Sequence, residues 1–233
     1  MTRSTDPGTA HTGYADYRDT VASSFRSAYD AHRDRWTDDP VAAGITDFAV
    51  AAVRRHRPGA PYPDPAVRLL DIGAGRGHQS AVLAERLGAD VTAVDLLPVA
   101  DATAPRRGRV RHVVGDFLDL APADGRYDVL LDNGCLHHQR PEDWARFVAH
   151  GRRLLADDGL WVLCTFLSPG PEVAFHDQAD GRHNVWFTPD DLQELFTTAG
   201  LVRVDETVLD RRFAARGFDL AYLLQTFVVG GAG

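Results

Sequence analysis

Residues 69–77, Leu-Leu-Asp-Ile-Gly-Ala-Gly-Arg-Gly, decide the fold of this chain. Their apolar start predicts a buried β-strand, and the three glycines that follow predict a tight turn into a helix. Glycine has no Cβ and accepts positive φ angles, so such a turn can bring bare backbone against a ligand. A second predicted strand, 91–94, ends directly before Asp95, whose carboxylate can accept hydrogen bonds from both hydroxyls of a ribose. Together these segments predict a nucleoside-binding crevice.

The chain around this stretch alternates between predicted strands and helices. Strands are expected at residues 67–72, 91–95, 110–115, 128–132, 160–166, 202–209 and 220–229, and helices at 78–87, 141–155 and 188–199. Alternation of this kind implies a parallel sheet with helices on both faces. No helix separates the final two strands, so the last one is expected to run antiparallel. The predicted fold class is α/β, with a Rossmann-like, seven-stranded and mostly parallel sheet.

The residues before the first strand predict an N-terminal helical cap. Residues 1–13 are polar and contain prolines and glycines, so we expect them to be disordered. Aromatic side chains then recur at three- and four-residue steps from Tyr14, predicting a helix to Trp36, and a second helix follows from Pro40. We therefore expect a cap or lid at 14–65 and a core at 66–233, within one domain overall.

Composition excludes several classes of protein. The net charge of −8 argues against a nucleic-acid surface, and no apolar run is long enough to span a membrane. All 25 basic residues are arginine, which excludes chemistry that depends on lysine. Two cysteines make no disulfide framework, and the polar N-terminus shows no secretory signal, so a cytoplasmic location is expected. The oligomeric state stays open between a monomer and a homodimer.

The glycine spacing distinguishes two families of nucleotide-binding proteins. Dinucleotide-binding proteins use G-x-G-x-x-G, whereas this chain has G-x-G-x-G from Gly73 to Gly77, preceded by Asp71. This pattern resembles the class I S-adenosylmethionine (SAM)-dependent methyltransferases. An acidic residue before the glycines suits a ligand with an ammonium and a sulfonium better than a diphosphate. Segments similar to those of the family follow in the same order at residues 113–117, 127–134, 154–163 and 187–192, so the resemblance covers roughly residues 66–229.

The resemblance implies SAM as the cofactor and S-adenosylhomocysteine (SAH) as the product. It assigns Asp95 to the ribose, and Asp116 with Phe117 to the adenine. The methionine part is expected against the glycine turn and the backbone of Asn133 and Gly134. The implied cofactor-binding residues are Asp71, Gly73, Ala74, Gly75, Gly77, Asp95, Leu96, Asp116, Phe117, Asn133 and Gly134.

Two adjacent histidines are the catalytic candidates. Residues 132–139, Asp-Asn-Gly-Cys-Leu-His-His-Gln, resemble a stretch of a thiopurine-methyltransferase-like subset of small-molecule methyltransferases. His137 is the first candidate for a general base and His138 the second, because a neutral hydroxyl benefits from one. The alternative is that one histidine caps the helix beginning near Pro141 and the other is exposed.

An insert at residues 167–187 follows the fifth predicted strand and is expected to overhang the acceptor pocket. The cap helix is expected to close the same pocket. The candidate substrate-binding residues are Tyr14, Tyr17, Phe25, Tyr29, His176, His183 and Trp186. Metal-ligand spacing is not present among the histidines, so no metal site is expected.

These observations predict a methyltransferase that moves a methyl group from SAM to an O, N or S atom of a small molecule. The high-GC type of composition suggests a bacterial secondary metabolite. One alternative is a SAM- or SAH-binding protein of the same fold that catalyses a non-methylating reaction such as a cyclisation. Another is a nicotinamide oxidoreductase, against which the glycine spacing argues.

Overall fold

The computed structural model describes residues 13–34, 36, 40–57, 63–64, 66–99, 109–121, 126–213 and 218–230. The predicted disorder at 1–13 falls, except for Gly13, outside these residues. The helices are α1 (Tyr14–Asp30), α2 (Pro40–His56), α3 (His78–Leu87), α4 (Pro141–Leu154) and α5 (Pro189–Thr197), with the short 3-10 turns η1 (Phe117–Asp119) and η2 (Leu136–His138). The strands are β1 (Arg68–Ile72), β2 (Asp90–Asp95), β3 (Arg109–Val114), β4 (Tyr127–Asn133), β5 (Leu155–Leu167), β6 (Ala174–Phe175), β7 (Val185–Phe187), β8 (Leu201–Phe213) and β9 (Phe218–Val229).

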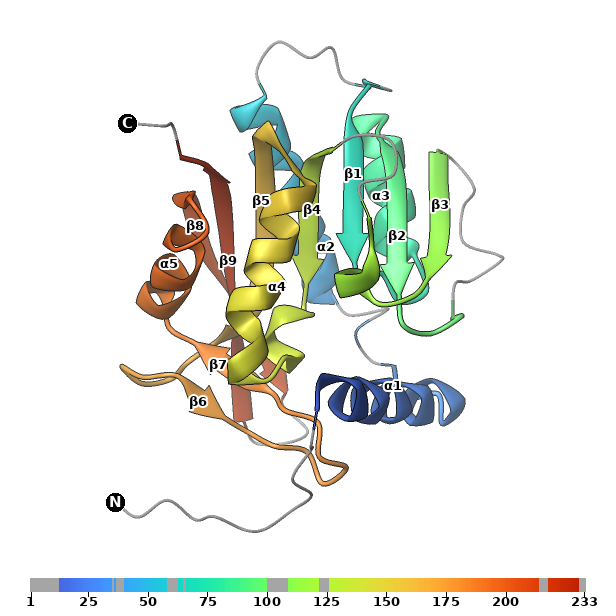
Figure 1. The fold of residues 1–233 in the computed structure, drawn as a ribbon, viewed down its shortest axis with the longest axis vertical. Coiled ribbons are helices and arrows are strands. Elements are labelled where there is room, and N and C mark those ends of the chain that lie inside the picture. Colours follow the sequence, from blue (N-terminus) through green and yellow to red (C-terminus); the bar gives the residue numbers. More distant parts are fainter. Residues whose placement is uncertain are drawn as a thin grey trace.

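These strands form one nine-stranded mixed sheet, whose main order is β3-β2-β1-β4-β5-β7-β6. Strands β1 to β5 pair in parallel with their neighbours. The last strand, β9, runs antiparallel to both β5 and β8, as predicted. Parallel β1 to β4 place their carboxyl ends along one edge of the sheet, and α1 lies across that edge (Figure 1).

The sheet has two strands more than the predicted seven. Both are short and lie in the 167–187 insert, where β7 continues the edge of β5 beyond the last residue of β4. Phe166 and Leu167 pair with Trp186 and Phe187 there, which satisfies backbone groups that β4 does not reach. The α1 helix also ends earlier than predicted, at Asp30, because the backbone turns left-handed at His32 with φ 52°.

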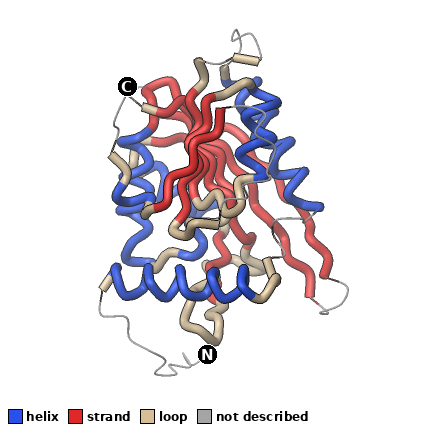
Figure 2. The backbone as a smooth tube through the Cα atoms, turned by 90° about the vertical axis from the view of Figure 1, so that its right-hand side faces the viewer, coloured by secondary structure: helices blue, strands red, loops and turns tan. Residues whose placement is uncertain are grey.

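Helices cover both faces of the sheet, as predicted (Figure 2). Side chains alternate along each strand, so Leu69 packs in a core with α2 and α3, whereas Leu70 packs in a core with α4 and α5. The two helices predicted to form a cap therefore take different places: α2 covers a face of the sheet, and α1 crosses the strand ends. No helix in the described part of the chain has the length and apolar character to cross a membrane.

The packing of α4 on the sheet depends on Gly151. A Cβ at this position would lie 2.3 Å from two ring atoms of Trp161, which is fully buried. We expect Gly151→Ala to lower the free energy of unfolding, because overpacking costs about 1–3 kcal/mol. At so close an approach the cost of overpacking exceeds the roughly 1 kcal/mol by which alanine is more favourable than glycine inside a helix. Urea unfolding measures the difference.

The matched control for this variant is Gly170→Ala, since a Cβ there meets no atom within 4 Å. The control is expected to stay within about 1 kcal/mol of the parent chain. A Gly151→Ala variant as stable as the parent chain would contradict the packing described for α4.

Candidate active site

The glycine turn leads from the end of β1 into α3, and hydrogen bonds hold it against the end of β2. Its three glycines have φ angles of 69°, 55° and 81°, the left-handed region that favours glycine. The N–H groups of Gly73 and Ala74 both donate to the carbonyl of Val94, at 2.8 and 3.0 Å. A Cβ on Gly73 would lie 2.1 Å from Sγ of Cys135. The Cys135 side chain therefore occupies the space where a side chain on Gly73 would lie.

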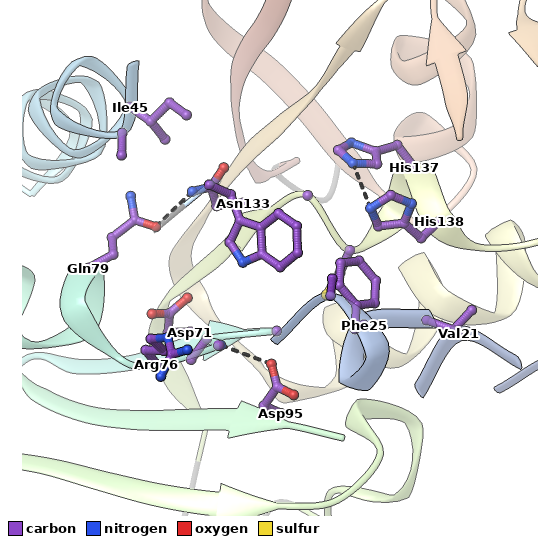
Figure 3. A pocket seen from close by; sticks show the side chains of 18 of the residues that line it. Val21, Phe25, Ile45, Asp71, Arg76, Gln79, Asp95, Asn133, His137 and His138 are labelled. Carbon is purple, nitrogen blue, oxygen red and sulfur yellow. Dashed lines mark hydrogen bonds between the residues drawn. The ribbon is translucent and has the colours of Figure 1, made fainter. Parts of the chain in front are cut away.

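Asp95 stands at the end of β2 with its carboxylate fixed by two backbone groups (Figure 3). Gly75 N–H donates to Oδ2 at 2.9 Å, and Leu97 N–H donates to Oδ1 at 2.8 Å. Burial raises the pKa of this carboxyl above its ordinary value. Each oxygen keeps a second lone pair, so both can still accept a hydrogen bond from a diol.

Two further acids stabilise the loops around the turn. Asp71 is 2% exposed and accepts a hydrogen bond from Ser80 Oγ at 2.5 Å, and burial raises its pKa to about 6. Asp132, at the end of β4, accepts from the N–H of Cys135 at 2.6 Å, and burial raises its pKa to about 7. Asp132 thus orients the backbone that carries the two histidines.

Asp116 and Phe117 lie at the end of β3, beside a small pocket of about 50 Å³. Asp116 accepts from Leu118 N–H at 2.9 Å and from the hydroxyl of Tyr14 at 2.8 Å. The ring of Phe117 packs against Phe147, with ring centroids 4.7 Å apart. The Asp116 carboxylate is therefore already bound by α1, and the Phe117 ring belongs largely to the core.

A larger cavity of about 1140 Å³ opens beside the glycine turn and adjoins the small pocket at Gly73 and Asp95. Most predicted site residues line it: Asp71, Gly73, Ala74, Gly75, Gly77, Asp95, Leu96, Asn133, Gly134, His137, His138, Phe25, Tyr29, His176 and Trp186. Tyr14, Tyr17, Asp116 and Phe117 line the small pocket instead, and the His183 side chain lines neither.

His183 and Tyr17 contribute through contacts that the sequence does not predict. The Tyr17 hydroxyl donates to the carbonyl of His138 at 2.6 Å and accepts from His183 N–H at 3.0 Å. The His183 ring stacks on Tyr17 and lies 2.5 Å from Asp177 Oδ1. Hydrogen bonds of these two residues therefore connect α1 with both η2 and the insert.

The two candidate catalytic histidines form a buried pair at η2 (Figure 3). Their Nε2 atoms lie 3.1 Å apart, and His138 Nδ1 lies 2.9 Å from the carbonyl oxygen of His183. The His137 ring stacks on Phe166 with centroids 4.0 Å apart. Burial, assisted by the charge of Arg182, lowers the pKa of His137 to about 3. His137 is thus neutral at physiological pH and a weak proton acceptor.

Arg182 is a site residue that the sequence reasoning missed. It lies in the insert, lines the large cavity, and its Nε donates to Ser24 Oγ of α1 at 2.9 Å. In the sequence it stands in an Asp-Gly-Arg-His run, which is typical of a solvated loop. Only the contact with α1, far away along the chain, places it at the cavity.

Comparison with known families identifies the architecture. The methyltransferase-domain family matches residues 34–221, which is most of the chain. The chain belongs to this methyltransferase family. The cofactor of the family is SAM.

Two relatives of this methyltransferase illustrate the range of the family. The 1,6-didemethyltoxoflavin-N1-methyltransferase of Burkholderia thailandensis, solved with 1,6-didemethyltoxoflavin and SAH, is 32% identical, with a TM-score of 0.79 over 96% of this chain and 93% of that one. A ubiquinone biosynthesis O-methyltransferase of Cereibacter sphaeroides is 35% identical over 63% of this chain. The chain spans only 64% of the length of that curated relative.

A more distant structure shares the fold alone. The magnesium protoporphyrin IX methyltransferase of Synechocystis PCC 6803, solved with SAM, has a TM-score of 0.67 at 17% identity, over 93% of this chain and 99% of that one.

The residues of the two adjoining pockets fit SAM. Asp95 offers two oxygens to a ribose, the three glycines of the turn add no side chain to the cavity, and Asp116 keeps lone pairs for an adenine amine. Drug-sized ligands commonly occupy about 300–1,000 Å³, so the large cavity has room for part of a cofactor and for an acceptor. Among the described residues, no three His, Cys, Asp or Glu side chains cluster as metal ligands.

We expect Asp95→Ala to weaken SAH binding by about 1.5–3 kcal/mol, the usual range for hydrogen bonds to a charged group. Calorimetry on the purified chain measures the change. The control, Asp119→Ala, removes an exposed carboxylate outside both pockets and should bind SAH as the parent chain does. Unchanged affinity of Asp95→Ala would contradict the assignment of this residue to the ribose.

Proposed function

We propose that this protein transfers the methyl group of SAM to a ring nitrogen, or a ring-conjugated oxygen, of a small planar heteroaromatic molecule of bacterial secondary metabolism. The observation that carries the proposal is a single cavity with two unlike walls. One wall is the glycine turn with Asp95, and the other is aromatic, with Phe25, Phe166 and Tyr222 around the histidine pair.

The shape and composition of the aromatic wall favour a flat acceptor. Aromatic rings prefer stacked or edge-on contacts with other rings, and such contacts add about 0.5–1.5 kcal/mol beyond area burial. Trp186 and Phe25 also line this part of the cavity, on the insert and on α1.

The relatives support a nitrogen or oxygen atom as the acceptor. The 32% identical structure is named for methylation at N1 of a didemethyltoxoflavin, and the curated relative is named for O-methylation in ubiquinone biosynthesis. The nitrogen acceptor is favoured because the first comparison extends over 96% of this chain.

Bound SAM supplies an electrophilic methyl carbon on a sulfonium, so the residues of the chain need only position the acceptor and exclude water. The α1 helix excludes water, since it covers the strand ends and contacts both the insert and η2. Burial keeps the rings of His137 and His138 neutral, and only His137 Nδ1 makes no hydrogen bond with a described residue.

Incubation with SAM and a panel of nitrogen heterocycles and catechols tests the proposal, with product mass as the readout. We expect the gain of one methyl group on at least one planar heterocycle, together with stoichiometric SAH. SAH is expected to raise the melting temperature, and NAD is not. Binding of SAH with conversion of an acceptor that gains no methyl group would instead indicate a non-methylating reaction.

Kinetics of a His137 variant can distinguish a residue that positions the acceptor from one that acts as a general base. We expect His137→Gln, which keeps a hydrogen-bonding group, to lower kcat/KM by about tenfold or less, the value of one ordinary hydrogen bond. His137 is a weak base in its buried setting, so little is lost with its basicity. Steady-state kinetics, with an acceptor identified in the panel of heterocycles, measures the change in kcat/KM. A loss of about 10²–10⁴-fold would identify His137 as a general base and contradict the positioning role.

A further inference from the structure

We propose that Arg182 binds the acceptor as an anion, which makes it a specificity-determining residue of this enzyme. The acceptor class is a planar heterocycle with a ring N–H or O–H that ionises because a ring carbonyl is conjugated to it. This inference rests on the proposed function and names the charge state of its substrate.

Arg182 is fixed at the cavity between α1 and the insert. Its guanidinium carbon lies 4.5 Å from the centre of the Phe25 ring, a cation–π distance. Its Nε donates to Ser24 Oγ at 2.9 Å, and its Nη1 donates to Asn184 Oδ1 at 3.0 Å. The guanidinium plane is thus oriented before any acceptor binds, which limits the entropy lost on binding.

The guanidinium retains donors for a ligand. Its Nη2 makes no hydrogen bond with any residue that the structure describes. No described carboxylate lies within ion-pair distance of Arg182. Asp180 accepts from its backbone N–H at 3.2 Å, and the charge of Asp180 raises the pKa of the guanidinium from a longer distance, less than burial lowers it. Three other arginines line the cavity: Arg76 pairs with Asp34, Arg86 pairs with Asp47, and Arg33 is exposed to solvent.

The charge of Arg182 is also not offset by the histidine pair. His138 Nδ1 faces a carbonyl oxygen, so the hydrogen-bond network assigns the proton to Nδ1 and leaves Nε2 as an acceptor. His137 Nε2 then donates to it, and His137 Nδ1 is left as a buried lone pair with no partner. Both rings are neutral and adjacent to Arg182, whose Nη1 lies against the His138 ring, 3.1 Å from Nδ1 and 3.2 Å from Nε2.

A partly buried cation with no described carboxylate at ion-pair distance favours an anionic ligand, because an opposite charge within about 4–6 Å stabilises the ionised form of an acidic group. Neutral Tyr17, whose pKa burial raises to about 12, faces the same region from α1 and supplies no negative charge. The negative charge of a bound acceptor would therefore balance the positive charge of Arg182.

An anionic acceptor also removes the need for a strong base. Its proton leaves to solvent before the reaction, and its nitrogen or oxygen then forms a bond to the methyl carbon. The S–C bond of the cofactor breaks with its electron pair remaining on sulfur. The negative charge of the acceptor and the positive charge of the sulfonium cancel, and no proton moves in this step.

Two matched probes test the inference: lumazine, a bicyclic heterocycle with ionisable ring N–H groups, and 1,3-dimethyllumazine, which has none. Calorimetry uses the full chain saturated with SAH, at a pH above the first ring pKa of lumazine. We expect lumazine to bind at least about tenfold more tightly than its dimethyl form. Arg182→Met should remove this preference, and Arg182→Lys, which keeps the charge, should retain part of it.

The control variant is Arg26→Met, an exposed arginine of α1 that lines neither pocket. It should bind both probes as the parent chain does, and each variant is saturated with SAH at its own measured affinity before the probes are added. Equal binding of the two probes, a preference that survives Arg182→Met, or no lumazine binding in the SAH-loaded chain would overturn the inference. Failure of the parent chain to bind SAH would instead overturn the proposed function on which it rests.

Discussion

The whole site depends on hydrogen bonds that join the glycine turn to the end of β2. Gly73 and Ala74 donate to Val94, and Gly75 donates to the carboxylate of Asp95. These bonds require the backbone of the turn to lie directly against a neighbouring strand, which left-handed glycines without Cβ atoms permit. They fix the position of Asp95, the acid that the family resemblance assigns to the ribose.

The α1 helix connects the two halves of the site. Tyr14 contacts Asp116 beside the small pocket, Tyr17 contacts the backbone of His138, and Ser24 contacts Arg182 beside the large cavity. One helix therefore spans both pockets. Binding on either side acts on the same set of contacts, which gives a physical reason for cofactor and acceptor sites to form together.

Local patterns were sufficient to predict the framework. The seven main strands, the antiparallel β9 and the acids at the strand ends follow from periodicity, turn chemistry and family resemblance. The short strands β6 and β7 were not predicted, because their few residues form no readable pattern. The role of Arg182 depends on Ser24, which lies 158 residues away, and His183 contributes its backbone while its side chain lies against Asp177. Such long-range contacts leave no local signal in one sequence.

A crystal structure of the chain with SAH tests the central claim most directly. The account predicts that the ribose hydroxyls bind Asp95, that the adenine lies beside Asp116, and that the amino-acid part lies against the glycine turn. The space beside Phe166 and His137 should remain open for an acceptor. SAH bound with its ribose away from Asp95, or within the aromatic wall, would contradict the account.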